Sequence, residues 1–364
     1  MKIKIAIFLL IIFCVPHIKS QDIDLESLPA VDDYLVYRSN PEADTVLITL
    51  HGGPFEKLSQ GEFDFLESIP TFSVVDMMKY HHFKNGILED TTVTLEQAVA
   101  INDTTVAMIK KAVDHFVSEG KEVVVIGHSF GGYLIHEYLD DYGIQYEHKV
   151  ISLGSRLNFN QILVDFMLMG HLVEFDADGL SIDIDQIASD EFKTTLTFIV
   201  SMAQNRYVDS LGMMDLSKLL MVTGKLDRSV GRLLPEELEM LDNTNASSLV
   251  LENGGHNDPI SSQESLIAIL DFIRRCELST VSTSQEKLDD YQIYPTVTTG
   301  ILNIKSENGS RLNIHTLTGE MMLSKPINSQ HQIVQLPSLP NGTYIAVLRM
   351  NDDKLIVRKI IYQN

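Results

Sequence analysis

The chain has 364 residues, only two cysteines, and 50 acidic against 28 basic side chains. Residues 21–290 carry 46 acidic and 18 basic residues, a net charge of −28, which argues against nucleic acid and anionic membrane surfaces as partners. Residues 291–364 carry a net charge of +3, so the composition predicts a domain boundary near 280–290.

Residues 1–20 have the pattern of a secretory signal peptide. Two lysines precede an apolar stretch of 11 residues from Ile5 to Val15, Pro16 ends this stretch, and Ser20-Gln21 is a plausible cleavage point. The stretch is too short to span a membrane comfortably. Its removal leaves Cys276 as the single cysteine, so the exported chain cannot form an internal disulfide.

Strand-like runs alternate with helical patterns between residues 33 and 275. The runs predict strands at residues 33–39, 45–50, 72–76, 122–126, 149–154, 219–224 and 248–251, and the periodic patterns predict helices at 95–116, 132–139, 235–241 and 262–275. Such alternation is typical of a mostly parallel sheet covered by helices, an α/β fold.

The alternation breaks between residues 156 and 217. This stretch shows no convincing strand, and residues 162–173 and 192–203 have helical patterns. We expect a helical lid over the carboxyl edge of the sheet, where open α/β sheets bind ligands. The alternative is a set of ordinary core helices. The expected first domain is therefore 21–279, with its lid at about 156–217, followed by a polar linker at 280–290.

Residues 127–131 read G-x-S-x-G, and the residues on either side make this pattern more specific. An apolar β-branched run lies before them, and a helical pattern that opens with two glycines follows. A strand, a sharp turn and a helix form the context of a nucleophile elbow, in which a strained serine needs small neighbours. We therefore expect Ser129 to be a nucleophile; the alternative is a tight turn with an idle serine.

A nucleophilic serine needs a base, and the base needs an acid that orients it. Asp227 follows the predicted strand 219–224, and His256 follows the predicted strand 248–251. Both therefore fall on loops that can converge on Ser129, in the chain order serine, acid, histidine. We predict a triad of these three residues.

Two other acids stay open as alternatives for the orienting carboxylate. Asp209 and Asp215 lie shortly before the strand that precedes Asp227. The loop after strand 149–154, another place for this acid, holds no carboxylate before Asp165.

An oxyanion formed at the serine needs fixed N–H donors. The N–H of Phe130, next to the serine, is the first expected donor. The second is expected from the sequence His51-Gly52-Gly53-Pro54 after the strand 45–50, with Gly53 as its source, because glycine allows backbone to approach a substrate closely. The alternative for residues 51–54 is a plain Gly-Pro turn.

These motifs together resemble the α/β-hydrolase fold. Residues 30–275 are most similar to the branch that contains proline iminopeptidases and related esterases and lipases, through the HGGP and GHSFGG stretches. The resemblance implies a lidded hydrolase domain but does not name a substrate. That branch usually carries Asp-x-Arg-Gly-x-Gly-x-Ser, whereas residues 76–82 read DMMKYHH, a departure that weakens the aminopeptidase interpretation.

Two patterns suggest metal sites only superficially. Residues 174–185 loosely follow the spacing of a Ca²⁺ loop, but the first position is Glu174 rather than Asp and the twelfth is Asp185 rather than Glu. Asp176, Asp178 and Gly179 lie between them, and we interpret the whole stretch as a solvated acidic loop. His81-His82 is likewise interpreted as loop sequence, so we expect no metal and no cofactor.

Residues 291–364 are expected to form a separate small β-sandwich. Strand-like runs occur at residues 294–304, 311–317, 332–335, 343–349 and 355–362, separated by glycines and by Asn341-Gly342. This segment resembles the C-terminal sorting domain of type IX secretion through Tyr294-Pro295, Thr299-Gly300, 317–319 (LTG), 339–344 (LPNGTY) and Arg358-Lys359, although Val297 replaces a usual proline. The alternative is a carbohydrate-binding or adhesive domain.

The sequence thus favours a secreted serine hydrolase that cleaves an ester or amide bond through an acyl-enzyme. Two alternatives remain: an aminopeptidase of the proline iminopeptidase type, and a non-catalytic binding protein on a hydrolase scaffold. The expected partners are a small-molecule or peptide substrate and, through the tail, the secretion machinery, with no nucleic acid and no stable membrane insertion. We expect export through the periplasm to the cell surface or the medium.

Overall fold

The computed structural model describes residues 22–55, 57–58, 61–145, 148–159, 161–177, 179–180, 182–274, 292–294, 297–306, 309–316, 321–349 and 355–363. Internal contacts divide the chain into two units, Met1–Cys276 and Glu277–Asn364. The expected signal peptide, Cys276 and the expected linker lie outside the described residues. Among the helices that are described, none is both long and apolar enough to cross a membrane.

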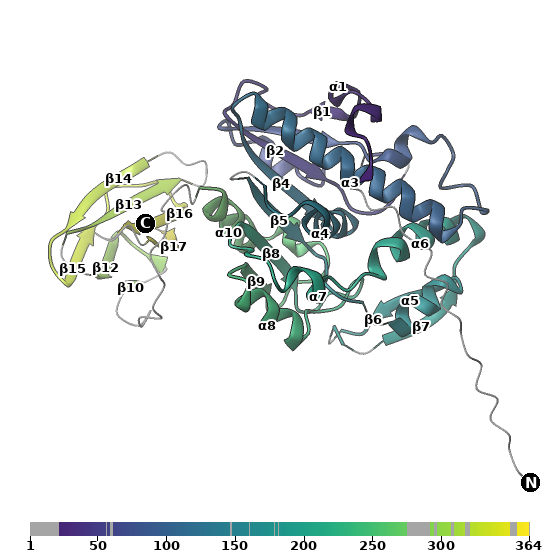
Figure 1. Cartoon of the computed structure of the whole chain (residues 1–364). Helices are drawn as coiled ribbons and strands as arrows, with labels where there is room; N and C mark the ends of the chain where they lie inside the picture. Colours follow the sequence, from purple (N-terminus) through teal and green to yellow (C-terminus); the bar gives the residue numbers. More distant parts are fainter. Residues whose placement is uncertain are drawn as a thin grey trace, which may run out of the picture. The chain divides into compact units, whose positions relative to one another are not determined.

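The first unit is built on a seven-stranded sheet in the order β1-β3-β2-β4-β5-β8-β9 (Figure 1). Its strands are β1 (Leu35–Tyr37), β2 (Thr45–Leu50), β3 (Phe72–Met77), β4 (Glu122–His128), β5 (Lys149–Leu153), β8 (Leu219–Gly224) and β9 (Ser247–Leu251). Only β1 runs antiparallel to its neighbour, while every other pair is parallel. The mostly parallel α/β sheet predicted from the sequence is confirmed.

Helices cover both faces of this sheet, because the strand side chains alternate between two apolar cores. In β4, Val123 and Val125 join the core formed with α3 (Leu95–Ser118) and α4 (Phe130–Tyr142). The intervening Val124 points to the other core, which includes residues of α2 (Asp64–Glu67) and α10 (Gln263–Arg274). Both faces of β4 are buried, as its continuous β-branched sequence predicts.

The first unit contains further helices. They are η2 (Leu25–Ser27), α1 (Val31–Tyr34), η3 (Tyr80–Phe83), α8 (Pro235–Asn243) and α9 (Asp258–Ser261), together with α5 to α7 of the insertion described next. The predicted strand at 33–39 is shorter than expected, because α1 occupies its first residues and β1 begins at Leu35.

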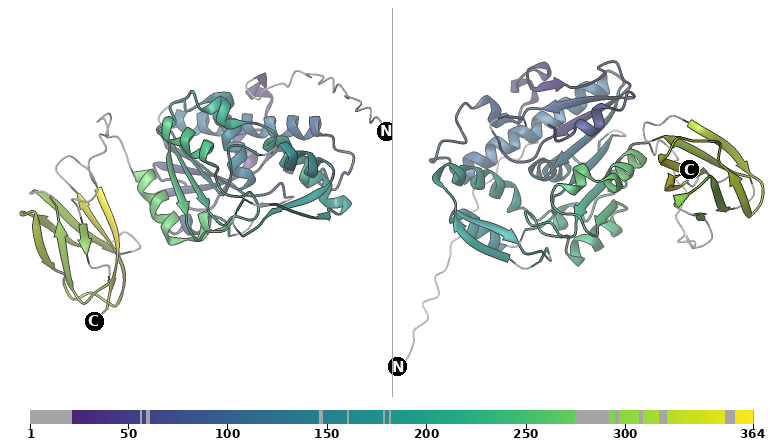
Figure 2. Two further views of the ribbon diagram at one scale, coloured as in Figure 1. Left: turned by 90° about the horizontal axis from the view of Figure 1, so that it is seen from below. Right: turned by 180° about the vertical axis from the view of Figure 1, so that it is seen from behind.

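The insertion after β5 differs from the all-helical lid that we predicted. Besides α5 (Gln161–Leu168), α6 (Asp190–Ala203) and α7 (Tyr207–Leu211), it contains an antiparallel hairpin of β6 (His171–Phe175) and β7 (Ile182–Ile187). The predicted helix 162–173 is therefore wrong in its second half. Gly170, at φ +84°, ends the helix, and its carbonyl accepts the Ala188 N–H at 2.7 Å to close the base of the hairpin. Figure 2 shows the hairpin and α5 together at one end of this unit.

The second unit is a sandwich of two mainly antiparallel sheets. One sheet has the order β10-β12-β15 and the other β11-β17-β16-β13-β14. The strands are β10 (Gln292–Tyr294), β11 (Val297–Thr298), β12 (Ile301–Lys305), β13 (Ser310–Thr316), β14 (Met321–Ile327), β15 (His331–Gln335), β16 (Gly342–Arg349) and β17 (Leu355–Tyr362). The predicted β-sandwich is confirmed, but the sequence reading missed β14, which contains Pro326.

The sandwich has its own apolar core, which includes Leu312, Ile314 and Leu348. Leu339 and Tyr344, from the LPNGTY stretch, are buried in the same core, and the Tyr344 hydroxyl donates to the Pro340 carbonyl at 2.9 Å. Residues 317–319 of the expected sorting motif lie outside the described residues.

Candidate active site

Ser129 sits in strained backbone at the turn between β4 and α4. Its φ of +52° and ψ of −115° lie in a region that non-glycine residues rarely adopt. The surrounding glycines are required sterically. A Cβ on Gly127 would lie 2.3 Å from the Gly131 carbonyl oxygen, and one on Gly131 would lie 2.1 Å from the Leu50 carbonyl oxygen. The elbow is therefore pressed directly against the end of β2.

The structure brings Ser129, His256 and Asp227 into one hydrogen-bonded chain. His256 Nε2 lies 2.9 Å from Ser129 Oγ, and His256 Nδ1 lies 2.8 Å from Asp227 Oδ2. Asp227 comes from the loop after β8 and His256 from the loop after β9, two neighbouring strands whose carboxyl ends face the elbow. With Nδ1–H donating to the carboxylate, Nε2 is free to accept the serine proton.

Asp227 is buried and fixed by backbone hydrogen bonds. It is 1% exposed, and its second oxygen, Oδ1, accepts the N–H groups of Ser229 and Val230 at 2.8 and 3.0 Å. The two alternative acids are engaged elsewhere. Asp209 pairs with Arg206 at 3.0 Å in an exposed position, and Asp215 accepts the Ser217 N–H at 3.1 Å.

The loop that follows β2 lies against the elbow. A Cβ added to Gly52 would be 3.4 Å from the Ser129 Cβ, and Gly53 adopts a φ of +52° that favours glycine. Phe130 is the first residue of α4, so its N–H belongs to the helix-start donors that have no partner within the helix. Of the two residues expected to supply oxyanion donors, Phe130 follows Ser129 directly and Gly53 belongs to the loop that lies against the elbow.

A buried network of carboxylates and imidazoles supports this loop, and the sequence reading did not find it. Glu62 Oε1 accepts the Gly52 N–H at 2.9 Å and is hydrogen-bonded to His128 Nδ1, while Glu62 Oε2 lies 3.1 Å from His51 Nδ1. His51 Nε2 in turn lies 2.9 Å from Asp76 Oδ1. His128 Nε2 contacts the His256 carbonyl at 3.2 Å, so the network reaches the backbone of the triad histidine.

The pKa shifts within the network agree with alternating charges. Burial alone would lower the pKa of His51, but hydrogen bonds to Asp76 and Glu62 outweigh burial and raise it. Burial opposes ionisation of both carboxylates, yet the pKa of Glu62 is lowered strongly by His128 and His51, and that of Asp76 is lowered by His51. The His51 ring therefore lies between two carboxylates, and both of them favour its protonated form.

A second set of basic groups lies behind the same loop. Lys79 is buried, and its Nζ donates to the Gly53 carbonyl at 2.7 Å and the Gly52 carbonyl at 3.3 Å. His81 and His82, in η3, both direct Nε2 to the Phe55 carbonyl, at 2.9 and 3.0 Å. Burial, together with the charge of Lys79, lowers the pKa of His81 to about 3 and that of His82 to about 4, so both rings are neutral donors.

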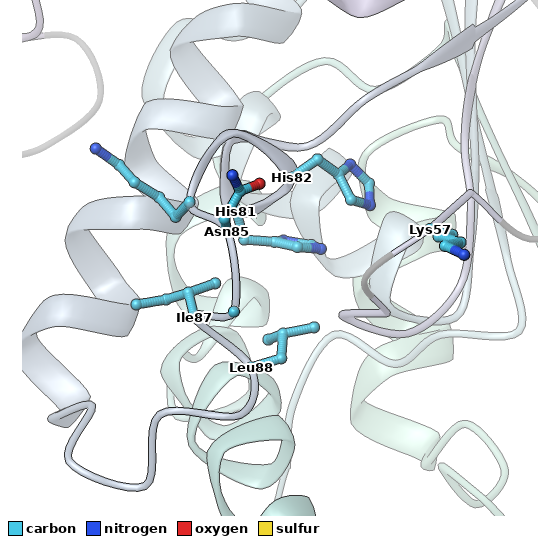
Figure 3. Close-up of a pocket in the computed structure, with 8 residues that line it drawn as sticks. Lys57, His81, His82, Asn85, Ile87 and Leu88 are labelled. Atoms are coloured by element: carbon cyan, nitrogen blue, oxygen red, sulfur yellow. The ribbon is translucent and has the colours of Figure 1, made fainter.

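A cavity of about 220 Å³ lies beside this loop (Figure 3). Its lining residues are Lys57, His81, His82, Lys84, Asn85, Gly86, Ile87 and Leu88. None of these lining residues is acidic, although residues 21–290 carry a large excess of acids. Ser129, Asp227 and His256 are not among the lining residues either.

Candidate metal ligands lie apart from the triad. Among the described residues, Glu137, Asp140 and Asp141 have oxygens within 4.8 Å of one another, but Glu137 already accepts from Asn205 and Tyr207 at 2.7 and 2.8 Å. In the stretch that loosely follows Ca²⁺-loop spacing, Glu174 pairs with Arg228 at 3.1 Å. Asp178 of that stretch lies outside the described residues.

Comparison with known proteins gives a family for the tail. Residues 292–363 match the family described as the secretion system C-terminal sorting domain. This match agrees with the resemblance seen in the sequence and indicates export through a secretion system. A search of curated proteins found no similar sequence.

About two thirds of the chain is similar in structure to several solved proteins. A lipase-esterase related protein from Clostridium acetobutylicum has 16% sequence identity and a TM-score of 0.46, with 66% of this chain and 98% of the other covered. A structure reported for the metagenome-derived lipolytic enzymes LipS and LipT has 17% identity and a TM-score of 0.44, covering 68% and 98%. A bromoperoxidase from Bacillus anthracis has 17% identity and a TM-score of 0.43, covering 66% and 95%.

The first unit has the α/β-hydrolase fold that the sequence predicted. The strand order of its sheet and the strand–serine–helix turn on the fourth strand carry this assignment.

Proposed function

We propose that this protein is a secreted serine hydrolase that cleaves an ester or amide bond through a covalent acyl-enzyme. The single observation that supports it best is the continuous hydrogen-bonded chain from Ser129 through His256 to the buried Asp227. Three side chains from three loops meet at hydrogen-bond distances, with the serine in strained backbone that presents it outside the sheet.

In the proposed reaction, Ser129 Oγ attacks the substrate carbonyl while His256 Nε2 takes its proton. Asp227 keeps His256 in the required tautomer and stabilises the imidazolium that forms. The N–H groups of Gly53 and Phe130 are the proposed donors to the oxyanion of the tetrahedral intermediate. Collapse of this intermediate expels the alcohol or amine, which receives the proton from His256, and water then hydrolyses the acyl-enzyme by the same steps.

An ester is favoured over an N-terminal peptide as the substrate. Residues 76–82 depart from the pattern that the proline iminopeptidase branch usually carries, and this departure supports the preference.

Secretion to the cell surface or the medium is part of the proposal. The sorting-domain match at residues 292–363 supports it, and so does the signal-like pattern of residues 1–20. The proposed route passes the inner membrane first and the outer membrane second.

The test is turnover of p-nitrophenyl esters and aminoacyl arylamides by the mature chain and by Ser129→Ala. We expect ester hydrolysis that exceeds arylamide hydrolysis, and a fall in kcat of about 10⁴-fold or more in the variant. Ser261→Ala, at an exposed serine on α9, serves as a matched control and should keep full activity. Activity of Ser129→Ala within tenfold of the parent would rule out the mechanism.

A further inference from the structure

A lysine that takes no part in the triad contacts both residues proposed to supply the oxyanion donors. Lys79 Nζ donates to the carbonyls of Gly53 and Gly52 at 2.7 and 3.3 Å, and it lies 5.4 Å from the centre of the Phe130 ring. Its side chain is among the largest that are fully buried in the described residues. A buried ammonium is expensive unless it is paired, so its position calls for a reason.

The geometry of the peptide bond gives that reason. In a trans peptide the carbonyl and the following N–H point in opposite directions. The carbonyl of Gly52 and the N–H of Gly53 belong to one such peptide, so an ammonium that holds the carbonyl on one side turns the N–H to the other. A Cβ built on Gly52 would lie 3.4 Å from the Ser129 Cβ, which shows how closely this peptide approaches the serine.

The loop also needs such a restraint. Gly52 and Gly53 have the freest backbone of all residue types, and Gly53 holds a φ of +52°. Glu62 fixes the Gly52 N–H, and His81 and His82 fix the Phe55 carbonyl. Lys79 fixes the two carbonyls that lie between these anchors.

We propose that Lys79 is the positioning residue of the oxyanion hole: its ammonium holds the Gly52 and Gly53 carbonyls and thereby aims the Gly53 N–H at the reacting carbonyl. The same positive charge polarises the Gly52–Gly53 peptide and makes its N–H a stronger donor. The inference rests on the proposed hydrolase function. Lys79 lies one residue beyond the position of the arginine in the Asp-x-Arg-Gly pattern that this chain lacks.

The positioning role of the Lys79 ammonium predicts that kcat depends on pH. Burial lowers the pKa of Lys79 to about 7, although the Glu62 carboxylate opposes this shift. The other titratable groups around it are His51, His81 and His82, of which the last two are neutral at pH 7. Because the ammonium is the active form, kcat should fall as the pH rises through this pKa.

The experiment compares Lys79→Met and Lys79→Gln with the parent enzyme. Removing a direct oxyanion donor lowers kcat by about 10²–10³-fold, so loss of a residue that only positions the donor should lower kcat about 10–100-fold, with KM changed less than about threefold. The glutamine variant retains an N–H donor and should recover part of the loss. The fall in kcat at alkaline pH should vanish in Lys79→Met.

Lys110→Met is the matched control. Lys110 is another buried lysine, but it lies on α3 beside Asp114 and away from the loop, so its loss should leave kcat and the pH profile unchanged. Equal losses in the Lys79 and Lys110 variants would mean a general stability effect and would overturn the proposal. Unchanged kcat in a folded Lys79→Met would overturn it too.

A crystal structure of Lys79→Met supplies a readout that does not depend on turnover. We expect the Gly52–Gly53 peptide to rotate away from its orientation in the parent. An unmoved peptide contradicts the positioning role. If the peptide rotates but Ser129 proves inert in the parent protein, the proposed hydrolase function is contradicted and the positioning role of Lys79 is not.

Discussion

The orientation of His256 depends on one carboxylate, although three were possible from the sequence. Asp227 is nearly inaccessible, and its Oδ1 is fixed by two backbone N–H groups, so its Oδ2 is directed at His256. In the sequence, Asp227 is preferred over the other two acids because it follows a predicted strand. The elbow could be predicted for the same local reason, because the strand, the glycines and the helix are all contiguous with Ser129.

Asp227→Asn should leave the fold intact and lower kcat by about 10⁴-fold, because an amide in place of the carboxylate favours the wrong tautomer of His256. Asp209→Asn and Asp215→Asn are matched controls, since both carboxylates bond elsewhere. Steady-state kinetics of the three variants decides between them. A control variant that loses activity as Asp227→Asn does would reassign the acid.

The network around Glu62 could not have been predicted from the sequence. Glu62 lies just before a four-residue helix, in a stretch without periodicity, and its partners His51 and His128 come from the ends of two different strands. Only the pairing of β2 with β4 brings them together. The same holds for Lys79, whose contacts are with backbone carbonyls that leave no sequence signature.

The residues of the candidate site lie on loops that follow the ends of the strands. The sheet order places the carboxyl ends of β2, β4, β8 and β9 on one edge of the sheet. The loop with Gly52 and Gly53, the elbow, Asp227 and His256 follow these strands. The secondary structure of the insertion after β5 was predicted less well, because an apolar run at β6 adjoins the helical pattern of α5 and cannot be distinguished from it by periodicity. Only Gly170 marks the boundary.

The start of the insertion is fastened to α8 by one buried carboxylate. Glu237 is fully buried and accepts the N–H groups of Leu157 and Asn158 at 2.9 and 3.0 Å, while its other oxygen pairs with Arg156 at 3.1 Å. It therefore anchors the chain where it leaves β5.

Glu237→Gln should lower the free energy of unfolding by about 3 kcal/mol. It removes one partner of a buried ion pair, and the glutamine NH2 group, which is a donor, would then face other donors in place of a carboxylate oxygen. For a domain of this size, the corresponding fall in Tm is about 6–12 °C. Glu239→Gln, an exposed position on the same helix, should change Tm by less than about 2 °C. Calorimetry checks both, and equal Tm values for the two variants would contradict the anchoring role.

The whole molecule consists of two units built to different patterns. The first has an acidic composition and an apolar core on each face of its sheet. The second has a core of its own, and its residues 291–364 carry a net charge of +3. The contacts place the division between the two units at Cys276 and Glu277. Ser129, Asp227, His256 and the proposed oxyanion donors all lie in the first unit.

Truncation after residue 280 should leave kcat/KM within about twofold and the Tm of the first unit nearly unchanged, because separate cores fold independently. In the native host the truncated chain should remain in the periplasm. Kinetics, calorimetry and fractionation test these outcomes together. Normal secretion combined with lost binding to a polymer or cell surface would make the tail an adhesive module instead.

Covalent capture of Ser129 tests the central claim most directly. A fluorophosphonate probe reacts with a serine only when a base activates it and donors stabilise the resulting oxyanion. Mass spectrometry of the digested protein should find the adduct on the peptide that contains Ser129, and none in Ser129→Ala. A folded parent protein that stays unlabelled, or an adduct that persists in Ser129→Ala, would contradict the account.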